Sequence, residues 1–202
     1  MTESPSEAPA RPAPSEIAER FAAMVGATAH GADHATAKVV VPADRWVEAH
    51  RTLKEHLPFF SYLAAVDWSA EVAVGDPPEG DGVEERYEVV TRLADVDEGK
   101  ALIVSTGLPK DAASLPTLTG VYAGADWHER EAAEMYGIVF EGHPNPVKLY
   151  LPDGFEGHPL RKSFPLLSRE VKPWPGTVDV EDMPSTDNPE APGGGDGGED
   201  AE

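Results

Sequence analysis

The chain has 202 residues, with 16 Lys and Arg against 37 Asp and Glu, so its formal net charge at neutral pH is −21. At about 150 residues per domain, this length allows one domain with tails. The acidic balance argues against nucleic-acid binding, which requires clustered Lys and Arg to displace phosphate counterions. The sequence contains no Cys, which excludes disulfides, thiol catalysis and thiolate-bound zinc or iron–sulfur clusters in this chain.

No apolar run reaches the ~18–20 residues that span a bilayer, and the N-terminus lacks the basic-then-apolar order of a signal peptide. We therefore expect a soluble, intracellular protein. Both ends have the composition of flexible tails. Residues 179–202 hold nine acidic residues, no basic residue and five Gly. Because such segments bury little apolar surface, residues 1–14 and 179–202 are predicted to be disordered tails.

The first elements after the N-terminal tail are predicted to be helical. Ser15 is a suitable N-cap for a helix that ends at Gly26, with apolar residues at i, i+4, i+7 and i+8. A short strand is expected over residues 38–41. Pro42 and Asp44 then begin a second helix, which includes His50 in its apolar stripe and ends before Pro58.

Three β-rich runs follow, at residues 59–68, 86–93 and 101–106, and a Gly- and Pro-containing loop at 75–82 separates the first two. Helices followed by strands with short turns favour an α+β fold over a repeated βαβ pattern. We therefore expect residues 15–141 to form a two-layer α+β domain with helices and a mainly antiparallel or mixed sheet.

A last helix is predicted over residues 126–137, with a capping box of Asp126 and Glu129 and a stop at Gly137. Its helical wheel places Trp127, Glu131 and Glu134 on one face, with Arg130 at the edge. One interpretation is an ordinary exposed face with an Arg130–Glu134 ion pair. The other is a docking face, with Trp127 as its anchor and Arg130 fixing a charged contact.

The three Glu of this helix are also candidates for acid–base or metal chemistry. Catalytic carboxylates need contrasting environments, and metal ligands must converge from several elements. Three Glu on one short helix provide neither by themselves.

Residues 142–178 form a segment with many prolines that we expect to be an extended arm. The tetrapeptide Glu-Gly-His-Pro occurs at 141–144 and again at 156–159. Seven Pro and four Gly between residues 142 and 176 exclude a long helix or an internal strand, yet the segment is rich in large apolar residues. It also has five basic and three acidic residues, in an otherwise acidic chain. Such an arm suits docking on a surface, either of its own domain or of a partner.

The two histidines of the repeated tetrapeptide, His143 and His158, have no characteristic metal-ligand spacing. We expect their rings to hydrogen-bond the backbone. A stand-alone His/carboxylate metallohydrolase that uses His143, His158 and Glu131 remains an alternative.

Several motifs in order resemble one family. They are Asp-Trp-His-Glu-Arg-Glu at 126–131, Met-Tyr-Gly-Ile at 135–138, Phe-Glu-Gly-His-Pro at 140–144, Leu-Pro-Asp at 151–153 and Phe-Glu-Gly-His-Pro-Leu-Arg-Lys at 155–162. The family is the thirty-kilodalton subunit of the proton-pumping NADH–quinone oxidoreductase, respiratory complex I. Ala-Val-Asp-Trp at 65–68 is similar to the family's N-terminal domain.

The resemblance implies a peripheral-arm subunit without an active site, cofactor or metal of its own, located at the cytoplasmic face of the cell membrane and attached to it only through the complex. Its implied partners are the quinone-site subunit and the iron–sulfur subunits. NADH, FMN, iron–sulfur clusters and quinone would belong to those other subunits. The motif residues that we expect to contact partners are Trp127, Glu129, Arg130, Glu131, Gly137, Gly142, His143, Pro144, Lys148, Gly157, His158, Pro159, Arg161 and Lys162.

The sequence departs from the family at two positions. Lys148 stands where adjacent arginines are frequent, and an ammonium group cannot reproduce a bidentate guanidinium contact. Asp126 replaces the usual Asn before the motif Trp. A close alternative to complex I is the homologous subunit of a membrane-bound hydrogenase or formate-oxidising complex.

Overall fold

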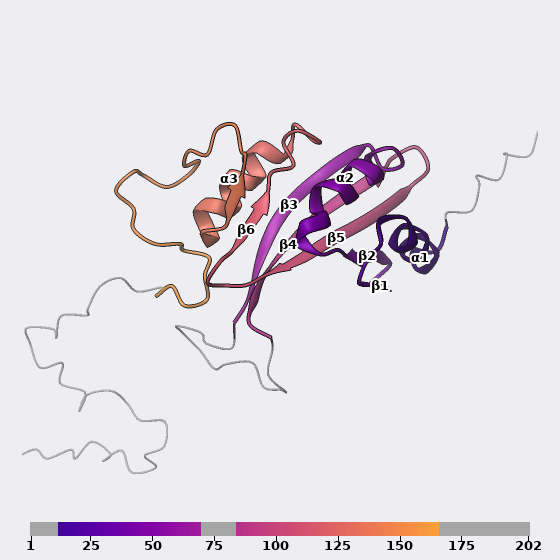
Figure 1. Ribbon diagram of the computed structural model, residues 1–202, viewed down its shortest axis with the longest axis horizontal. Coiled ribbons are helices and arrows are strands. Elements are labelled where there is room, and N and C mark those ends of the chain that lie inside the picture. Colours follow the sequence, from indigo (N-terminus) through magenta and orange to yellow (C-terminus); the bar gives the residue numbers. More distant parts are fainter. Residues whose placement is uncertain (1–11, 70–83, 166–202) are drawn as a thin grey trace, which may run out of the picture. The chain divides into compact units, whose positions relative to one another are not determined.

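The computed structural model describes residues 12–69 and 84–165 (Figure 1). The helices are α1 (Pro14–Val25), α2 (Trp46–Lys54) and α3 (Ala125–Tyr136), and a 3₁₀ turn at Ala43–Arg45 precedes α2. The strands are β1 (Ala29–Asp33), β2 (Thr36–Val40), β3 (Phe59–Trp68), β4 (Arg86–Asp95), β5 (Lys100–Leu108), β6 (Ser114–Pro116) and β7 (Val139–Glu141). None of the helices among these residues is long and apolar enough to cross a membrane.

The main sheet has five strands in the order β1-β2-β5-β4-β3. β2 and β5 are parallel, and the other neighbouring pairs are antiparallel. β6 and β7 form a separate parallel pair. The predicted α+β fold with a mixed sheet is therefore confirmed, and the predicted strands 38–41, 59–68, 86–93 and 101–106 correspond to β2, β3, β4 and β5.

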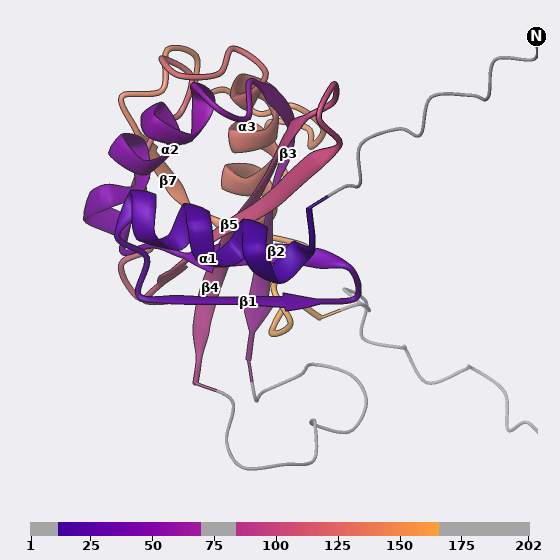
Figure 2. The ribbon, with the colours of Figure 1, turned by 90° about the vertical axis from the view of Figure 1, so that its right-hand side faces the viewer.

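One face of the sheet packs against the helices and forms the core. Alternate strand residues on this face, such as Val39, Val89, Leu93 and Leu102, are fully buried, as is Trp46 of α2. α1 contacts β1 and β2, and α3 contacts β3 at the other edge of the sheet. Figure 2 shows α1 alongside β1.

Two predicted helix starts are wrong. α1 begins at Pro14 with Ala13 as its N-cap, so Ser15 is already helical. The fixed φ of Pro suits the first helical position, where no N–H bond is needed. α3 is preceded by Gly124 and has no side-chain cap, so the capping box of Asp126 and Glu129 does not form. The predicted glycine ends are confirmed, since Gly26 and Gly137 both adopt left-handed φ.

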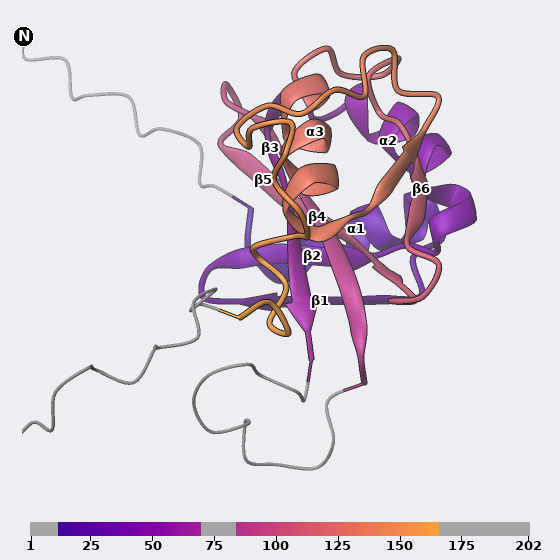
Figure 3. The same cartoon turned by 90° about the vertical axis from the view of Figure 1, so that its left-hand side faces the viewer.

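The described part of the arm, residues 142–165, contains neither a helix nor a strand. Figure 3 shows this orange segment passing around α3. The rest of the arm at 166–178, the acidic tail at 179–202, the loop at 75–82 and most of the N-terminal tail lie outside the described residues.

Candidate functional site

The two Glu-Gly-His-Pro copies lie at opposite ends of α3. His143 Nε2 is 3.2 Å from the Asp126 carbonyl oxygen, in the first turn of the helix. His158 Nδ1 is 2.8 Å from the Glu134 carbonyl oxygen, near its end. The expectation that both rings bond the backbone is confirmed.

The two imidazoles have different tautomers. The Asn145 backbone N–H donates to His143 Nδ1 at 3.1 Å, so the proton of this ring is on Nε2. In His158 the proton is on Nδ1, which donates to the carbonyl of Glu134. The repeated tetrapeptide therefore makes two different contacts, one at each end of α3.

Glu134 organises the middle of the arm. Its carboxylate accepts three backbone N–H groups, from Leu149 at 2.9 Å, Tyr150 at 3.0 Å and Leu151 at 2.5 Å. Burial of this side chain would by itself raise the pKa of the Glu134 carboxyl. The three N–H groups and the positive charge of Lys148 outweigh this effect, so the pKa is lowered.

Lys148 makes the complementary arrangement. Its ammonium donates to the carbonyl oxygens of Pro152 at 3.2 Å, Asp153 at 3.2 Å and Phe155 at 3.1 Å. A compact ammonium with three donors suits three converging carbonyls, which explains how Lys serves at a position where the family often has Arg. The Glu134 carboxylate and the Lys148 ammonium thus satisfy backbone N–H and carbonyl groups that a helix or strand would otherwise pair.

Arg130 holds the start of the same loop. Its Nε donates to the Val147 carbonyl at 2.9 Å, and one terminal nitrogen donates to the Lys148 carbonyl at 3.1 Å. The predicted Arg130–Glu134 ion pair is therefore wrong, because each side chain binds the arm backbone instead. The described part of the arm, residues 142–165, therefore docks on its own domain, which is one of the two alternatives left open by the sequence.

The second tetrapeptide and the residues after it cap the C-terminus of α3. The Leu160 N–H donates to the Met135 carbonyl at 3.2 Å, and Arg161 Nε donates to the Tyr136 carbonyl at 2.7 Å. The positive charge of Arg161 at the C-terminus of α3 also interacts favourably with the helix dipole. Gly137, with φ of +74°, makes room for this packing, since a Cβ there would lie 2.6 Å from His158 Nε2.

Asp67 on β3 anchors the end of the described arm. Its carboxylate accepts the Lys162 backbone N–H at 2.9 Å and pairs with Lys110 Nζ at 2.7 Å. Arg161 lies over the ring of Tyr87, with its guanidinium carbon 5.7 Å from the ring centre. The motif at 65–68 and the motif at 155–162 therefore meet in space, which the sequence did not reveal.

Glu129 is fully buried inside the domain. Its carboxylate accepts the Leu118 backbone N–H at 2.6 Å and the Thr117 hydroxyl, which fixes the turn before α3. Burial raises the pKa of the Glu129 carboxyl, although these hydrogen bonds and the nearby His143 oppose the shift. Neither Thr117 nor Leu118 was identified from the sequence.

The remaining motif residues shape turns or have few polar contacts. Gly142 and Gly157 adopt φ of +77° and +92°, which suits glycine. Pro144 is exposed and Pro159 is half-buried. Glu131 is half-buried on α3. Burial raises the pKa of Tyr136, and the charges of Asp67 and Glu131 add to this shift.

Four large apolar side chains stay exposed along α3 and the described part of the arm. The exposed fraction is 67% for Trp127, 52% for Val147, 62% for Tyr150 and 52% for Leu160. Trp127 is in the first turn of α3, and the arm contacts place Val147 near Arg130 and both Tyr150 and Leu160 near the last turn. We call these four residues the apolar stripe.

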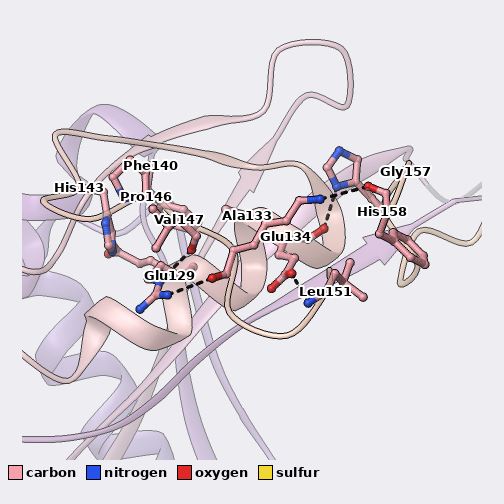
Figure 4. Close-up of a pocket in the computed structure, with 13 residues that line it drawn as sticks. Glu129, Ala133, Glu134, Phe140, His143, Pro146, Val147, Leu151, Gly157 and His158 are labelled. Carbon is pink, nitrogen blue, oxygen red and sulfur yellow. Dashed lines mark hydrogen bonds and ion pairs between the residues drawn. The ribbon is translucent and has the colours of Figure 1, made fainter. Parts of the chain in front are cut away.

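α3 and the arm enclose a cavity of about 290 Å³, lined partly by Phe140, Val147, Leu151 and Phe155 (Figure 4). In the close-up, His143 and His158 lie at opposite ends of this cavity. No group of three or more His, Asp or Glu within residues 12–69 and 84–165 could hold a metal ion. His143, His158 and Glu131, the residues of the metallohydrolase alternative, therefore do not form such a group.

Comparison with known proteins assigns the chain to a family. The family model described as "Respiratory-chain NADH dehydrogenase, 30 Kd subunit" matches residues 39–170. A subunit of NADH-quinone oxidoreductase from Rhizobium etli is 38% identical over 156 residues, covering 74% of both chains. The corresponding protein of Roseiflexus, also named as a subunit of NADH-quinone oxidoreductase, is 35% identical over 137 residues, covering 66% of this chain and 72% of the relative.

Two solved structures share the fold. A trypsin-resistant fragment of Nqo5 matches with a TM-score of 0.51 and 28% identity, covering 64% of this chain and 96% of the fragment. A chain of an archaeal membrane-bound sulfane sulfur reductase matches with a TM-score of 0.61 and 26% identity, covering 75% of this chain and 85% of that chain. The matched family, the level of identity and the shared fold together show that this chain belongs to the thirty-kilodalton subunits of respiratory NADH dehydrogenase. This is a family of subunits found in complex I-type enzymes.

Proposed function

We propose that this chain is a non-catalytic scaffold of the peripheral arm of NADH–quinone oxidoreductase, and that its apolar stripe binds the neighbouring quinone-site and iron–sulfur subunits at the cytoplasmic face of the membrane. The single observation that carries the proposal is the stripe itself. Exposed Trp and Tyr on a rigid support are typical anchors of protein interfaces. The support is rigid because Arg130, Glu134 and Lys148 bind the arm backbone.

The absence of Cys from the sequence supports a role without redox centres, since thiolates are the usual ligands of iron–sulfur clusters. NADH, FMN, the clusters and quinone would then be bound by other subunits. The names of the curated relatives favour NADH–quinone oxidoreductase as the parent complex. The alternative, a subunit of a related membrane-bound complex, draws support from the archaeal sulfane sulfur reductase.

The experiment replaces Trp127 by Ala in the full-length chain and measures two quantities. The free energy of unfolding should change by less than about 0.5 kcal/mol, because the side chain is mostly exposed. The amount of assembled complex recovered from membranes should fall at least about tenfold, as for an interface anchor worth about 2 kcal/mol or more.

Val96→Ala is a matched control, because Val96 is 71% exposed and lies in the turn after β4. It should leave both quantities unchanged. Normal assembly of the Trp127 variant would refute the proposal. Co-purification of subunits that oxidise NADH separates complex I from the related complexes.

A further inference from the structure

The sheet face away from the helices has an unusual composition. Among the described residues, no helix or strand covers it. Its outward positions include Val40, Ile103, Val90, Tyr62 and Val66, which stay partly exposed, with Val66 at 38%. An antiparallel sheet with one face toward water normally alternates apolar inward and polar outward residues. We call this set, together with Arg92, the open sheet face.

The strand register brings these residues into neighbouring positions. Ile103 pairs with Arg92, and Arg92 pairs with Tyr62, in one row across β5, β4 and β3. In the next row Val90 lies between Ser105 and Ala64. Arg92 is thus flanked by Ile103 and Tyr62 in its own row and has Val90 and Ala64 in the next, so apolar side chains from three strands surround one charge.

Arg92 is the unpaired charge of this face. It is half-buried, and within residues 12–69 and 84–165 no hydrogen bond, ion pair or ring contact involves its guanidinium. Lys38, in contrast, pairs with Glu88 at 2.6 Å, and Glu88 also accepts the Trp68 indole N–H at 2.8 Å. A guanidinium among apolar side chains is suited to a bidentate carboxylate.

A hollow lies on the same face and is lined by Ile103, the strand neighbour of Arg92. Its volume is about 640 Å³, and Val40, Ile103 and the side-chain-free Gly31 contribute to its lining. A Cβ at Gly31 would meet no atom within 4 Å, so the space beside this strand is open. The hollow can receive a side chain from a partner next to the Arg92 contact.

We propose that the open sheet face binds a segment of another subunit of the same complex, which presents apolar side chains to Val90 and Ile103 and a carboxylate to Arg92. A second copy of this chain fits poorly. A two-fold interface over this face would bring two Arg92 side chains together, and each copy carries a net charge of −21. The proposal assumes that the chain works within a complex, but it concerns a surface separate from the apolar stripe.

The test introduces the photo-cross-linker benzoylphenylalanine at Val66 or Val90 in the full-length chain within the membrane complex, followed by mass spectrometry of the linked peptides. We expect links to one peptide of another subunit that contains Asp or Glu. Arg92→Glu should lower the yield of these links at least about tenfold, through charge repulsion and loss of the ion pair. Replacing the identified carboxylate by Arg in the same background should restore it.

Arg51→Glu is the control, since Arg51 is exposed on α2 at the opposite face of the sheet. It should leave the yield unchanged, and thermal melting should show that both charge variants fold. Links only to this chain, links to a second copy, no links, or an unchanged yield with Arg92→Glu would each overturn the proposal. A cross-linker at Trp127 tests the apolar stripe separately, so failure of one surface is distinguishable from failure of the other.

Discussion

Replacing Glu134 should release the arm from α3 while the sheet stays folded. Glu134→Ala removes the acceptor of three backbone N–H groups. A hydrogen bond to a charged group contributes about 1.5–3 kcal/mol, but water can reach the freed N–H groups in this exposed loop. We therefore expect a total loss of about 2–3 kcal/mol in arm anchoring, less than three independent bonds would give.

Limited trypsin digestion measures this loss, because Lys148, Arg161 and Lys162 are cleavage sites whose side chains bind carbonyl groups in the closed arm. When opening is fast relative to cleavage, the rate follows the open population, so cleavage at Lys148 should accelerate about 30- to 150-fold. Glu134→Gln keeps one acceptor oxygen and should give a smaller acceleration. Thermal melting of the sheet should change little.

Glu131→Gln is the matched control, because Glu131 lies on the same helix and makes no hydrogen bond among the described residues. It should leave the cleavage rate within about twofold of the unmodified chain. If Glu134→Ala also stayed within this range, or if both variants accelerated cleavage equally, the idea that this carboxylate holds the arm would be refuted.

Three further predictions concern the same site. Because the folded-state pKa of Glu134 is lowered from 4.5, its contribution to arm anchoring is complete above that value and is lost as the pH falls through the folded-state pKa. Amide NMR of Leu151 should show this loss, and Glu134→Gln should remove the pH dependence. Because the pKa of Glu129 is raised, its contribution is present below 4.5 and is lost as the pH rises through the folded-state pKa. Glu129→Gln should therefore raise the melting temperature more at pH 8 than at pH 4, and equal shifts in calorimetry would contradict this. Lys148→Arg should accelerate hydrogen exchange of the Phe155 amide at least about fivefold, as should Lys148→Gln, because a planar guanidinium cannot hold three converging carbonyls.

The elements with strong periodicity were predictable from sequence. β3 has the predicted bounds, and both helix-ending glycines, Gly26 and Gly137, are where the sequence placed them. β1 was missed because Ala-His-Gly-Ala-Asp has low β propensity. Its turn to β2 uses His34 and Ala35, both with positive φ, where an Asn-Gly pair would be the recognisable signal.

The site was predictable as a set of residues, but the contacts between them were not. The spacing of Arg130 and Glu134 fits a helical ion pair, and only the folded arm reveals that backbone groups compete for both side chains. In the same way, Glu129 fits a capping box locally, but it is turned into the core by the hydrogen bonds from Thr117 and Leu118. Side chain to backbone contacts across many residues leave no periodic pattern in a sequence.

The way Glu134 holds the arm also determines which substitutions the arm tolerates. Its partners are the N–H groups of Leu149, Tyr150 and Leu151, which every amino acid except proline supplies. The exposed side chain at position 150 can therefore diverge to match different neighbours without altering the path of the backbone, whereas Leu151 also lines the cavity. A proline at any of the three positions would remove a donor, so this part of the arm combines a variable exposed position with a strict exclusion of proline at residues 149–151.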